Sequence, residues 1–283
     1  MLIGIAGDWH GNIKWAQRAI PALKRAGAEV IWHLGDLGLG FGRYSDANAY
    51  ANSLNYWLDK VGLDMNVVLG NHEGYEWIAK QPAGEPDRFN DEGIRRRGRL
   101  NILPRGYVFE LPSTSTPEGV IYGLAVSGAS SIDFRYRKVG FDWWLEENIT
   151  PAQASRIIGR LAELRRIGVV PTIMMAHDAP FGIAELDILS RQGGWSAEEL
   201  TYANQSRAQL DRIFREVMPA QFWHGHWHHY INKHVRFNHA EGTGSFETLV
   251  RGTTLEWSNR NTFILDTDTM LITPVSVWEA PAY

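Results

Sequence analysis

The sequence predicts an α/β protein that combines parallel strands with a second sheet toward the carboxyl end of the chain. In the first third, short apolar runs, polar loops containing glycine and segments with helical spacing follow one another in turn. This alternation favours parallel strands joined by helices, with functional residues in loops beyond the strands' carboxyl ends. The last quarter instead reads mostly as strands, which favours two sheets over one open sheet.

The first third contains three expected strands and two expected helices. The apolar runs that we expect to be strands are Leu2–Ala6, Val30–Leu34 and Val67–Leu69. Apolar residues recur at helical spacing in two segments, Ile13–Arg25 and Asp46–Lys60. Gly27 marks the end of the first helix, since glycine readily adopts the left-handed conformation found at helix ends.

Two irregular stretches divide the middle of the chain. Residues 82–106 are rich in Pro, Gly and charged side chains, and residues 127–149 show no regular pattern. Between them, Tyr107–Leu111 and Gly119–Val126 have the composition of strands around a Ser/Thr/Pro turn.

The second half contains two expected helices and several expected strands. One helix runs from Pro151 to Arg166, with Thr150 as its N-cap, and the other covers Ala197–Val217. The expected strands are Thr172–Ala176, Gln221–Trp223, Ile231–Phe237, Phe246–Val250, Thr262–Leu265 and Leu271–Val277. Because no internal repeat or clear linker interrupts the chain, we expect residues 1–283 to form a single domain.

Composition excludes several classes of protein. With 44% hydrophobic and 12% aromatic residues, the chain can bury a sizeable core and is not of the disordered type. A formal net charge of -4 provides no overall basic field for nucleic acid. The absence of cysteine excludes disulfides and thiolate metal sites. No apolar run is long enough to span a membrane and no signal peptide opens the chain, so we expect a soluble, cytoplasmic protein.

Five polar elements follow predicted strands. They are Asp8-x-His10, Gly35-Asp36, Gly70-Asn71-His72-Glu73, His177 and Gly225-His226-x-His228. Singly, most are weak signals, since Gly-Asp is common in turns and a histidine at a strand end can be a hydrogen-bonded core residue. The last element is stronger, because two histidines at i and i+2 on an irregular turn can reach two different metals. The flanking His224 and His229 are expected to be solvated or to lie behind the metal ligands.

Together the five elements resemble the pattern of the calcineurin-like metallophosphoesterase superfamily. That pattern is D-x-H, G-D, G-N-H-[ED], a lone H and G-H-x-H, and this chain has all five in that order between residues 8 and 228. The resemblance implies a four-layer α/β/β/α sandwich of two mixed sheets flanked by helices. It also implies a metal-dependent phosphoric ester hydrolase, a phosphatase or phosphodiesterase with two divalent metal ions.

The resemblance assigns a metal ligand to each of the five elements. Two cations about 3.5–4 Å apart need a bridging carboxylate to offset their repulsion, a role that falls to Asp36. One metal site would be completed by Asp8, His10 and His228. The other would be completed by Asn71, His177 and His226. This mixture of nitrogen and oxygen ligands suits Mn²⁺, Fe or Zn²⁺ better than Ca²⁺, and Mn²⁺ is the first expectation.

The remaining histidine of the third element, His72, is not expected to bind metal. It resembles the histidine that protonates the leaving oxygen in the family, while a hydroxide that bridges the metals attacks phosphorus in line. The near-neutral pKa of an ordinary histidine suits such a general acid.

Departures from the family's subgroups narrow the prediction. Protein serine/threonine phosphatases carry G-D-x-x-D-R-G and R-G-N-H-E, whereas this chain has Leu39 in the first segment and Leu69 before the second. The Asp that would orient His72 and the Arg that would bind phosphate are therefore missing. Purple acid phosphatases use D-x-G and a tyrosine ligand, so His10 and Leu39 argue against that subgroup. The chain looks most like small bacterial and phage-type enzymes, among which are phosphodiesterases, nucleotide hydrolases and nucleases.

Two arginine-bearing segments leave their roles open. In residues 127–149, Arg135 or Arg137 could clamp a substrate phosphate and Trp143 or Trp144 could stack on a base. The same segment could instead be a loop held by tryptophan burial and surface ion pairs. The cluster Arg95–Arg99 could contact a polyanion or simply be a solvated surface, and Arg43 is a weaker candidate of the same kind.

The leading functional hypothesis is hydrolysis of a small phosphoester or a nucleotide. A nuclease that uses the Arg95–Arg99 cluster is the alternative, disfavoured by the acidic net charge and the absence of a DNA-binding module. A metal-binding scaffold without activity is a third hypothesis, disfavoured because the expected ligands and His72 are all present. We expect no membrane association, and the oligomeric state stays open.

Overall fold

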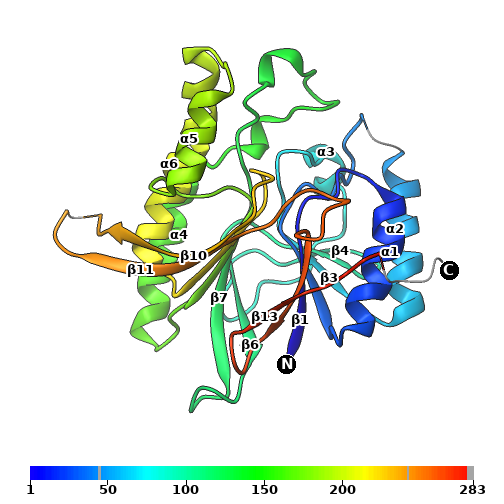
Figure 1. Ribbon diagram of the computed structural model, residues 1–283, viewed down its shortest axis with the longest axis horizontal. Coiled ribbons are helices and arrows are strands. Elements are labelled where there is room, and N and C mark those ends of the chain that lie inside the picture. Colours follow the sequence, from blue (N-terminus) through cyan, green and yellow to red (C-terminus); the bar gives the residue numbers. More distant parts are fainter. Residues whose placement is uncertain (44–45, 241, 279–283) are drawn as a thin grey trace.

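Two mixed β-sheets lie face to face between two layers of helices in the computed structural model, which describes residues 1–43, 46–240 and 242–278 (Figure 1). The first sheet has seven strands, in the order β13-β12-β1-β2-β3-β5-β4. Strands β1, β2, β3 and β5 are parallel, and the other three are joined antiparallel at the edges. These strands are β1 (Leu2–Ala6), β2 (Val30–His33), β3 (Met65–Val67), β4 (Arg95–Arg97), β5 (Leu100–Ile102), β12 (Thr262–Asp266) and β13 (Ile272–Pro274).

The second sheet has six strands, in the order β10-β11-β9-β8-β7-β6. Strands β7, β8, β9 and β11 are parallel, with β6 and β10 paired antiparallel at the two edges. These strands are β6 (Tyr107–Pro112), β7 (Val120–Val126), β8 (Ile173–Ala176), β9 (Gln221–His224), β10 (Ile231–Asn238) and β11 (Ser245–Gly252). The predicted fold class, two mixed sheets flanked by helices, is confirmed.

Helices cover the outer face of each sheet, as Figure 1 shows. On one side lie α1 (Ile13–Arg25), α2 (Ala47–Val61) and the short α3 (Tyr75–Ala79). On the other lie α4 (Pro151–Arg166), α5 (Ala184–Gln192) and α6 (Ala197–Val217). Local sequence sets their starts: the Thr150 side chain accepts a hydrogen bond from the Gln153 amide at the start of α4, as the predicted N-cap requires.

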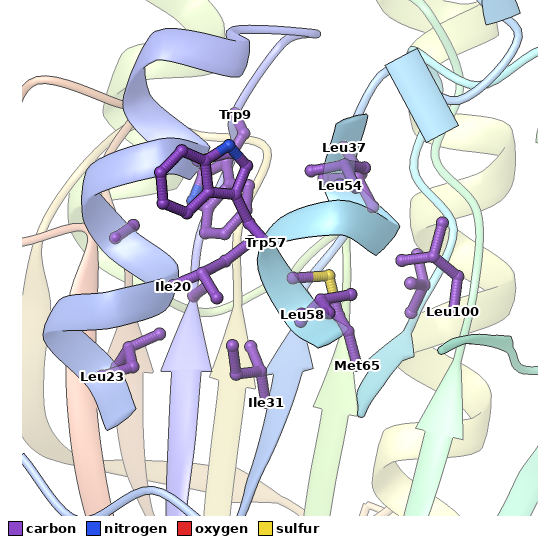
Figure 2. Packing of buried hydrophobic residues seen from close by; sticks show 14 of the residues in the cluster. Trp9, Ile20, Leu23, Ile31, Leu37, Leu54, Trp57, Leu58, Met65 and Leu100 are labelled. Carbon is purple, nitrogen blue, oxygen red and sulfur yellow. The ribbon is translucent and has the colours of Figure 1, made fainter. Parts of the chain in front are cut away.

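Apolar side chains form three layers of core, because successive residues of a strand point to opposite faces of the sheet. In the first sheet, Ile31 packs outward against α1 and α2, while its neighbour Trp32 packs inward. Figure 2 shows the outer layer, with Ile20 of α1 and Leu58 of α2 over the strands. A second outer layer lies under α4 and α6, and the inner layer fills the space between the sheets.

The structure differs from the sequence-based expectations mainly in short elements. Helices α3 and α5 and strands β4 and β5 were not expected, because three to nine residues carry too little periodicity to stand out. Strand β3 lies two residues earlier than predicted, and β13 is shorter than the expected Leu271–Val277. The stretch 127–149 is irregular as predicted, apart from two 3-10 turns, Phe134–Tyr136 and Leu145–Glu147. Within the described residues, no helix is long and apolar enough to cross a membrane.

Candidate metal centre

The five polar elements meet at one edge of the sandwich, beyond the carboxyl ends of parallel strands. Asp8 and His10 follow β1, and Asp36 follows β2. Asn71 lies beyond β3 in the same sheet. The remaining predicted ligands, His177, His226 and His228, follow β8 and β9 of the second sheet. The site is therefore built from both sheets, as expected where parallel strands end.

The seven predicted ligand residues are brought together as two neighbouring groups. Ligand atoms of Asp8, His10 and His228 lie within 4.8 Å of one another, and so do those of Asp36, His177 and His226. Asn71 joins the second group, with its Oδ1 3.2 Å from His177 Nε2. Asp36 connects the groups, since its Oδ2 is 3.6 Å from His10 Nε2 and its Oδ1 is 3.1 Å from His177 Nε2. The two groups contain the residues of the two predicted metal sites, whose roles as ligands stay predictions.

The backbone at the site adopts an uncommon conformation. Positive φ is unfavourable for residues other than glycine, costs on the order of 1–3 kcal/mol each and often occurs at functional sites. Four of the predicted ligands have it: His10 (φ 44°), Asp36 (φ 53°), His226 (φ 62°) and His228 (φ 49°). The turns thus hold side chains toward one point at a cost in backbone strain.

Three glycines next to predicted ligands make room for other predicted ligands. A Cβ at Gly70 would overlap the carboxylate of Asp36, and one at Gly225 would overlap that of Asp8. A Cβ at Gly35, whose φ is +101°, would overlap the ring of His177. The glycines of G-D, G-N-H and G-H-x-H are therefore required by close packing between loops of the two sheets.

The carboxylates and imidazoles shift one another's pKa values strongly. Burial alone would raise the pKa of Asp36, but the charges of His177 and His72 lower it well below its ordinary value. Burial alone would lower the pKa of His10, but Asp36 and Glu256 raise it to about 11. Asp36 and Asp8 likewise raise the pKa of His177 to about 10, against the effect of burial. Such a buried cluster of anions and basic nitrogens fits divalent cations, which would replace the protons on these rings.

His72 lies beside this centre in a different environment. Its ring stacks on Phe41 with centroids 4.7 Å apart, and its Nε2 accepts a hydrogen bond from Arg137 Nη2 at 2.8 Å. Burial and then the charge of Arg137 lower the pKa of His72 to about 3, even though Asp36 acts in the opposite direction. The expectation of a near-neutral pKa is therefore wrong for this state of the protein, because the sequence gives no sign of Arg137 at the ring. His72, His10 and Asp36 also have ligand atoms within 4.8 Å of one another.

Two of the imidazoles are oriented by groups that sequence reasoning missed. His10 Nδ1 lies 3.1 Å from Glu256 Oε2, and His177 Nδ1 lies 2.8 Å from the carbonyl oxygen of Leu34. Such partners for one ring nitrogen fix the tautomer and leave Nε2 directed at a metal. Glu256 stands in no motif and 246 positions from His10, so no sequence signal identifies it.

A chain of hydrogen bonds orients Asn71 in the same way. Its amide Nδ2 donates to Ser131 Oγ at 3.1 Å, and Ser131 Oγ donates to Glu147 Oε2 at 2.8 Å. The backbone N–H of Ser131 donates to the other carboxylate oxygen of Glu147 at 2.6 Å. With Nδ2 held by Ser131, the Oδ1 of Asn71 faces His177 and the centre. Sequence reasoning singled out the segment around Ser131 but not this connection.

The long loop of residues 127–149 is fastened at both ends by Arg105. This half-buried side chain donates to the carbonyl oxygens of Ser127 at 2.7 Å and Asn148 at 2.6 Å. Between these fixed ends the loop extends away from the sheets, in green in the upper part of Figure 1. It brings Arg137 to the centre, where this side chain is only 5% exposed and is also bonded to Asp133.

The other predicted arginines lie in surface ion pairs or strands. Arg43 is bonded to Asp142 and Arg135 to Glu198. The Arg95–Arg99 cluster forms the edge strand β4 and the turn to β5. Arg99 in this cluster contacts Asp59 and Asp64, which neutralise its charge locally.

Of the two flanking histidines, His224 is fully buried on β9 and His229 is half-buried. Solvation of His224 is therefore excluded, because the residue precedes the turn and still belongs to the strand. In residues 127–149, Trp144 is buried and Trp143 Nε1 donates to Tyr202. These contacts support the structural role for both tryptophans that the sequence left open.

Comparisons with known proteins agree with this geometry. The sequence pattern of one family, described as calcineurin-like phosphoesterase, matches residues 1–230. A solved dimetal phosphatase from Danio rerio is similar in fold, with a TM-score of 0.56 and 14% identity over 99% of this chain and 97% of that chain. The protein TT1561 of Thermus thermophilus has a TM-score of 0.52 and 12% identity over 98% of each chain. No curated protein matches the sequence.

Binding of Mn²⁺ to the metal-free protein should release protons. His10 and His177 are protonated at about pH 7.5, since their pKa values are raised to about 11 and about 10, and both must become neutral to bind a cation. We expect release of roughly two protons per chain and an apparent affinity that rises with pH. Calorimetric titrations in two buffers of different ionisation enthalpy measure this number. A heat that is independent of the buffer would contradict it.

Ser131→Ala should weaken one of the two metal sites selectively. Without the Ser131 hydroxyl, the amide of Asn71 loses the partner that orients it, and loss of such partners typically lowers metal affinity about 10–100-fold. Mn²⁺ titration of wild type, Ser131→Ala and Glu147→Gln measures the two affinities, with Ser53→Ala on the exposed face of α2 as the matched control. Equal affinities in wild type and Ser131→Ala would show that the hydrogen-bond chain has no such role.

Proposed function

The chain belongs to the calcineurin-like phosphoesterase family, and we propose that it hydrolyses a phosphate mono- or diester of a small molecule or nucleotide. The observation that carries this proposal is the pair of neighbouring ligand groups joined by Asp36, which belongs to the group with His177 and His226 and lies 3.6 Å from His10 of the other group. Arg137 and His72 lie beside them. Hydrolysis of a phosphoester at a two-metal site uses all three features: a paired-cation site, a cation for the phosphoryl oxygens and a group that can donate a proton.

The two ligand sets of the proposed site are those that the sequence motifs predict. We propose that one cation is held by Asp8, His10 and His228 and that the other is held by Asn71, His177 and His226. Asp36 is shared by both. These nitrogen and oxygen donors suit Mn²⁺, with Fe or Zn²⁺ as alternatives. When bound, two such cations supply an acidified water as nucleophile and offset charge on the phosphoryl oxygens.

Arg137 is the side chain best placed to bind the substrate phosphate. Leu69 stands where the protein serine/threonine phosphatases carry the phosphate-binding arginine of R-G-N-H-E, and Arg137 reaches the same motif from the long loop. Its Nη1 is 3.4 Å from the carbonyl oxygen of Asn71, and its Nη2 contacts His72. A guanidinium binds phosphate oxygens through paired hydrogen bonds, which are stronger than its single bond to a neutral imidazole.

Transfer of Arg137 to the phosphate would free Nε2 of His72 for its own role. Contact with a dianionic or monoanionic phosphoryl group favours the protonated imidazole, because opposite charges stabilise one another. His72 then donates a proton from Nε2 to the leaving oxygen. Stacking on Phe41 and the hydrogen bond from the His72 amide to Asp36 Oδ1, at 2.8 Å, hold the residue in place.

The distribution of arginines supports a small substrate over a nucleic acid. A polyanion requires a continuous basic surface. In the Arg95–Arg99 cluster, Arg95 is bonded to the carbonyl oxygen of Gln81, Arg97 to Asn52 and Arg99 to two aspartates. The arginines of this cluster therefore make contacts within the protein surface at the edge of the first sheet. For this reason we do not propose a nuclease.

Hydrolysis of p-nitrophenyl phosphate and bis-p-nitrophenyl phosphate tests the proposal. With added Mn²⁺ we expect turnover that a chelator abolishes, and a rate ratio that identifies the preferred ester class. His72→Ala should lower kcat about 10²–10⁴-fold, the typical contribution of a general acid. Arg137→Ala should raise KM and lower kcat together, at least roughly tenfold, because it removes a charge-assisted contact with phosphate.

Arg135→Ala is the matched control, since Arg135 belongs to the same loop but is paired with Glu198 on the surface. Its kinetic constants should stay close to those of wild type. Binding of Mn²⁺ without turnover of either ester would contradict the proposed activity and favour a metal-binding scaffold. Equal losses in Arg135→Ala and Arg137→Ala would assign the effect to the loop as a whole.

A further inference from the structure

A cavity of about 260 Å³ lies next to the proposed second metal site. His226 forms part of its wall, and Ile132 at the start of the long loop forms another part. The rest of the wall comes from α5, α6, the turn between them, and Asp178 and Trp227 in the loops after β8 and β9. The volume is slightly below the roughly 300–1,000 Å³ of pockets that hold drug-sized ligands, so the cavity fits one compact group.

One side of this cavity is an indole that its neighbours hold in place. Trp227 Nε1 donates to Asp178 Oδ1 at 2.9 Å, and the Arg207 guanidinium lies over the Trp227 ring at 4.7 Å. Arg207 is itself buried and donates to the carbonyl oxygens of Ala179 and Pro180. The aromatic surface of Trp227 is thus preorganised and loses little freedom when a ligand binds.

A second indole and a polar residue complete the cavity. Trp195 lies on the turn before α6, is 36% exposed and is available to pack on a ligand. Asn204 on α6 is half-buried, and its side chain has no hydrogen-bond partner among residues 1–43, 46–240 and 242–278. Its amide can therefore both donate to and accept from a ligand. Leu189 and Leu200 add apolar surface to the wall.

We propose that this cavity binds the organic group that the substrate carries on its phosphate. It selects a planar aromatic group with a polar edge, as in a nucleobase. Two indoles favour a flat ring, because stacking on aromatic side chains is stronger than contact with an aliphatic chain of similar size. Asn204 would bind donor and acceptor atoms at the ring's edge. The position beside His226 places this group within reach of the phosphorus site. This inference rests on the proposed function, because the ligand is taken to be part of a phosphoester.

Binding of adenosine tests the cavity without any need for turnover. Calorimetric titration of the full chain loaded with Mn²⁺ should show binding by wild type. Trp195→Ala should weaken it roughly 5- to 150-fold, the range for loss of one stacked aromatic side chain. Trp195→Phe should restore most of the affinity because the ring stays flat. Tyr56→Ala, at an exposed aromatic residue of α2, is the matched control and should bind like wild type.

Benzyl alcohol separates stacking from recognition of the polar edge, because its aromatic ring has no polar atoms at the edge. Trp195→Ala should weaken both ligands, whereas Asn204→Ala should weaken adenosine and leave benzyl alcohol unchanged. No adenosine binding, or equal adenosine affinity in wild type, Trp195→Ala and Asn204→Ala, would overturn the proposal. If Asn204→Ala weakens both ligands equally, selection of the polar edge is wrong. These binding outcomes do not depend on catalysis. Turnover of p-nitrophenyl phosphate tests the proposed function separately, so failure of one proposal can be told from failure of the other.

Discussion

The contact between Asp36 and His177 is the interaction on which the centre depends. These side chains come from different sheets, and their Oδ1 and Nε2 atoms lie 3.1 Å apart in a region closed to solvent. Such proximity of buried polar groups is tolerated only when opposite charges compensate one another. Glycine at positions 35 and 70 and the left-handed backbone of Asp36 are consequences of bringing the two loops this close.

The long loop of residues 127–149 adds the parts that the sheets cannot supply. Arg105 fastens the two ends of the loop, and the segment between them contributes Ser131, Arg137 and Glu147. Ser131 and Glu147 act on the orientation of Asn71, while Arg137 reaches His72. The sandwich thus provides the proposed metal ligands, and the loop provides the groups that orient Asn71 and the arginine that we propose to bind phosphate. This division is typical of sites that place functional loops on a rigid scaffold.

Much of the fold, and which polar residues come together at the candidate site, could be predicted because both depend on local patterns. Helices such as Pro151–Arg166 have capping residues at their starts, and the ligands follow apolar runs in short motifs with glycine. Glu256 and Glu147 could not be predicted, since they act across long sequence separations and belong to no motif. The low pKa of His72 depends on burial and on Arg137, which only the folded chain brings together. That residues 1–283 form one domain and that Mn²⁺ is the metal remain predictions.

The number of Mn²⁺ ions bound by wild type and by Asp36→Asn tests most directly whether two cations share Asp36. If Asp36 is shared by two cations, wild type binds two ions per chain, and the neutral amide of Asp36→Asn weakens both sites because it no longer offsets their repulsion. Metal analysis after equilibrium dialysis gives both numbers, with circular dichroism to establish that the variant is folded. Two ions bound with unchanged affinity in folded Asp36→Asn would contradict the account.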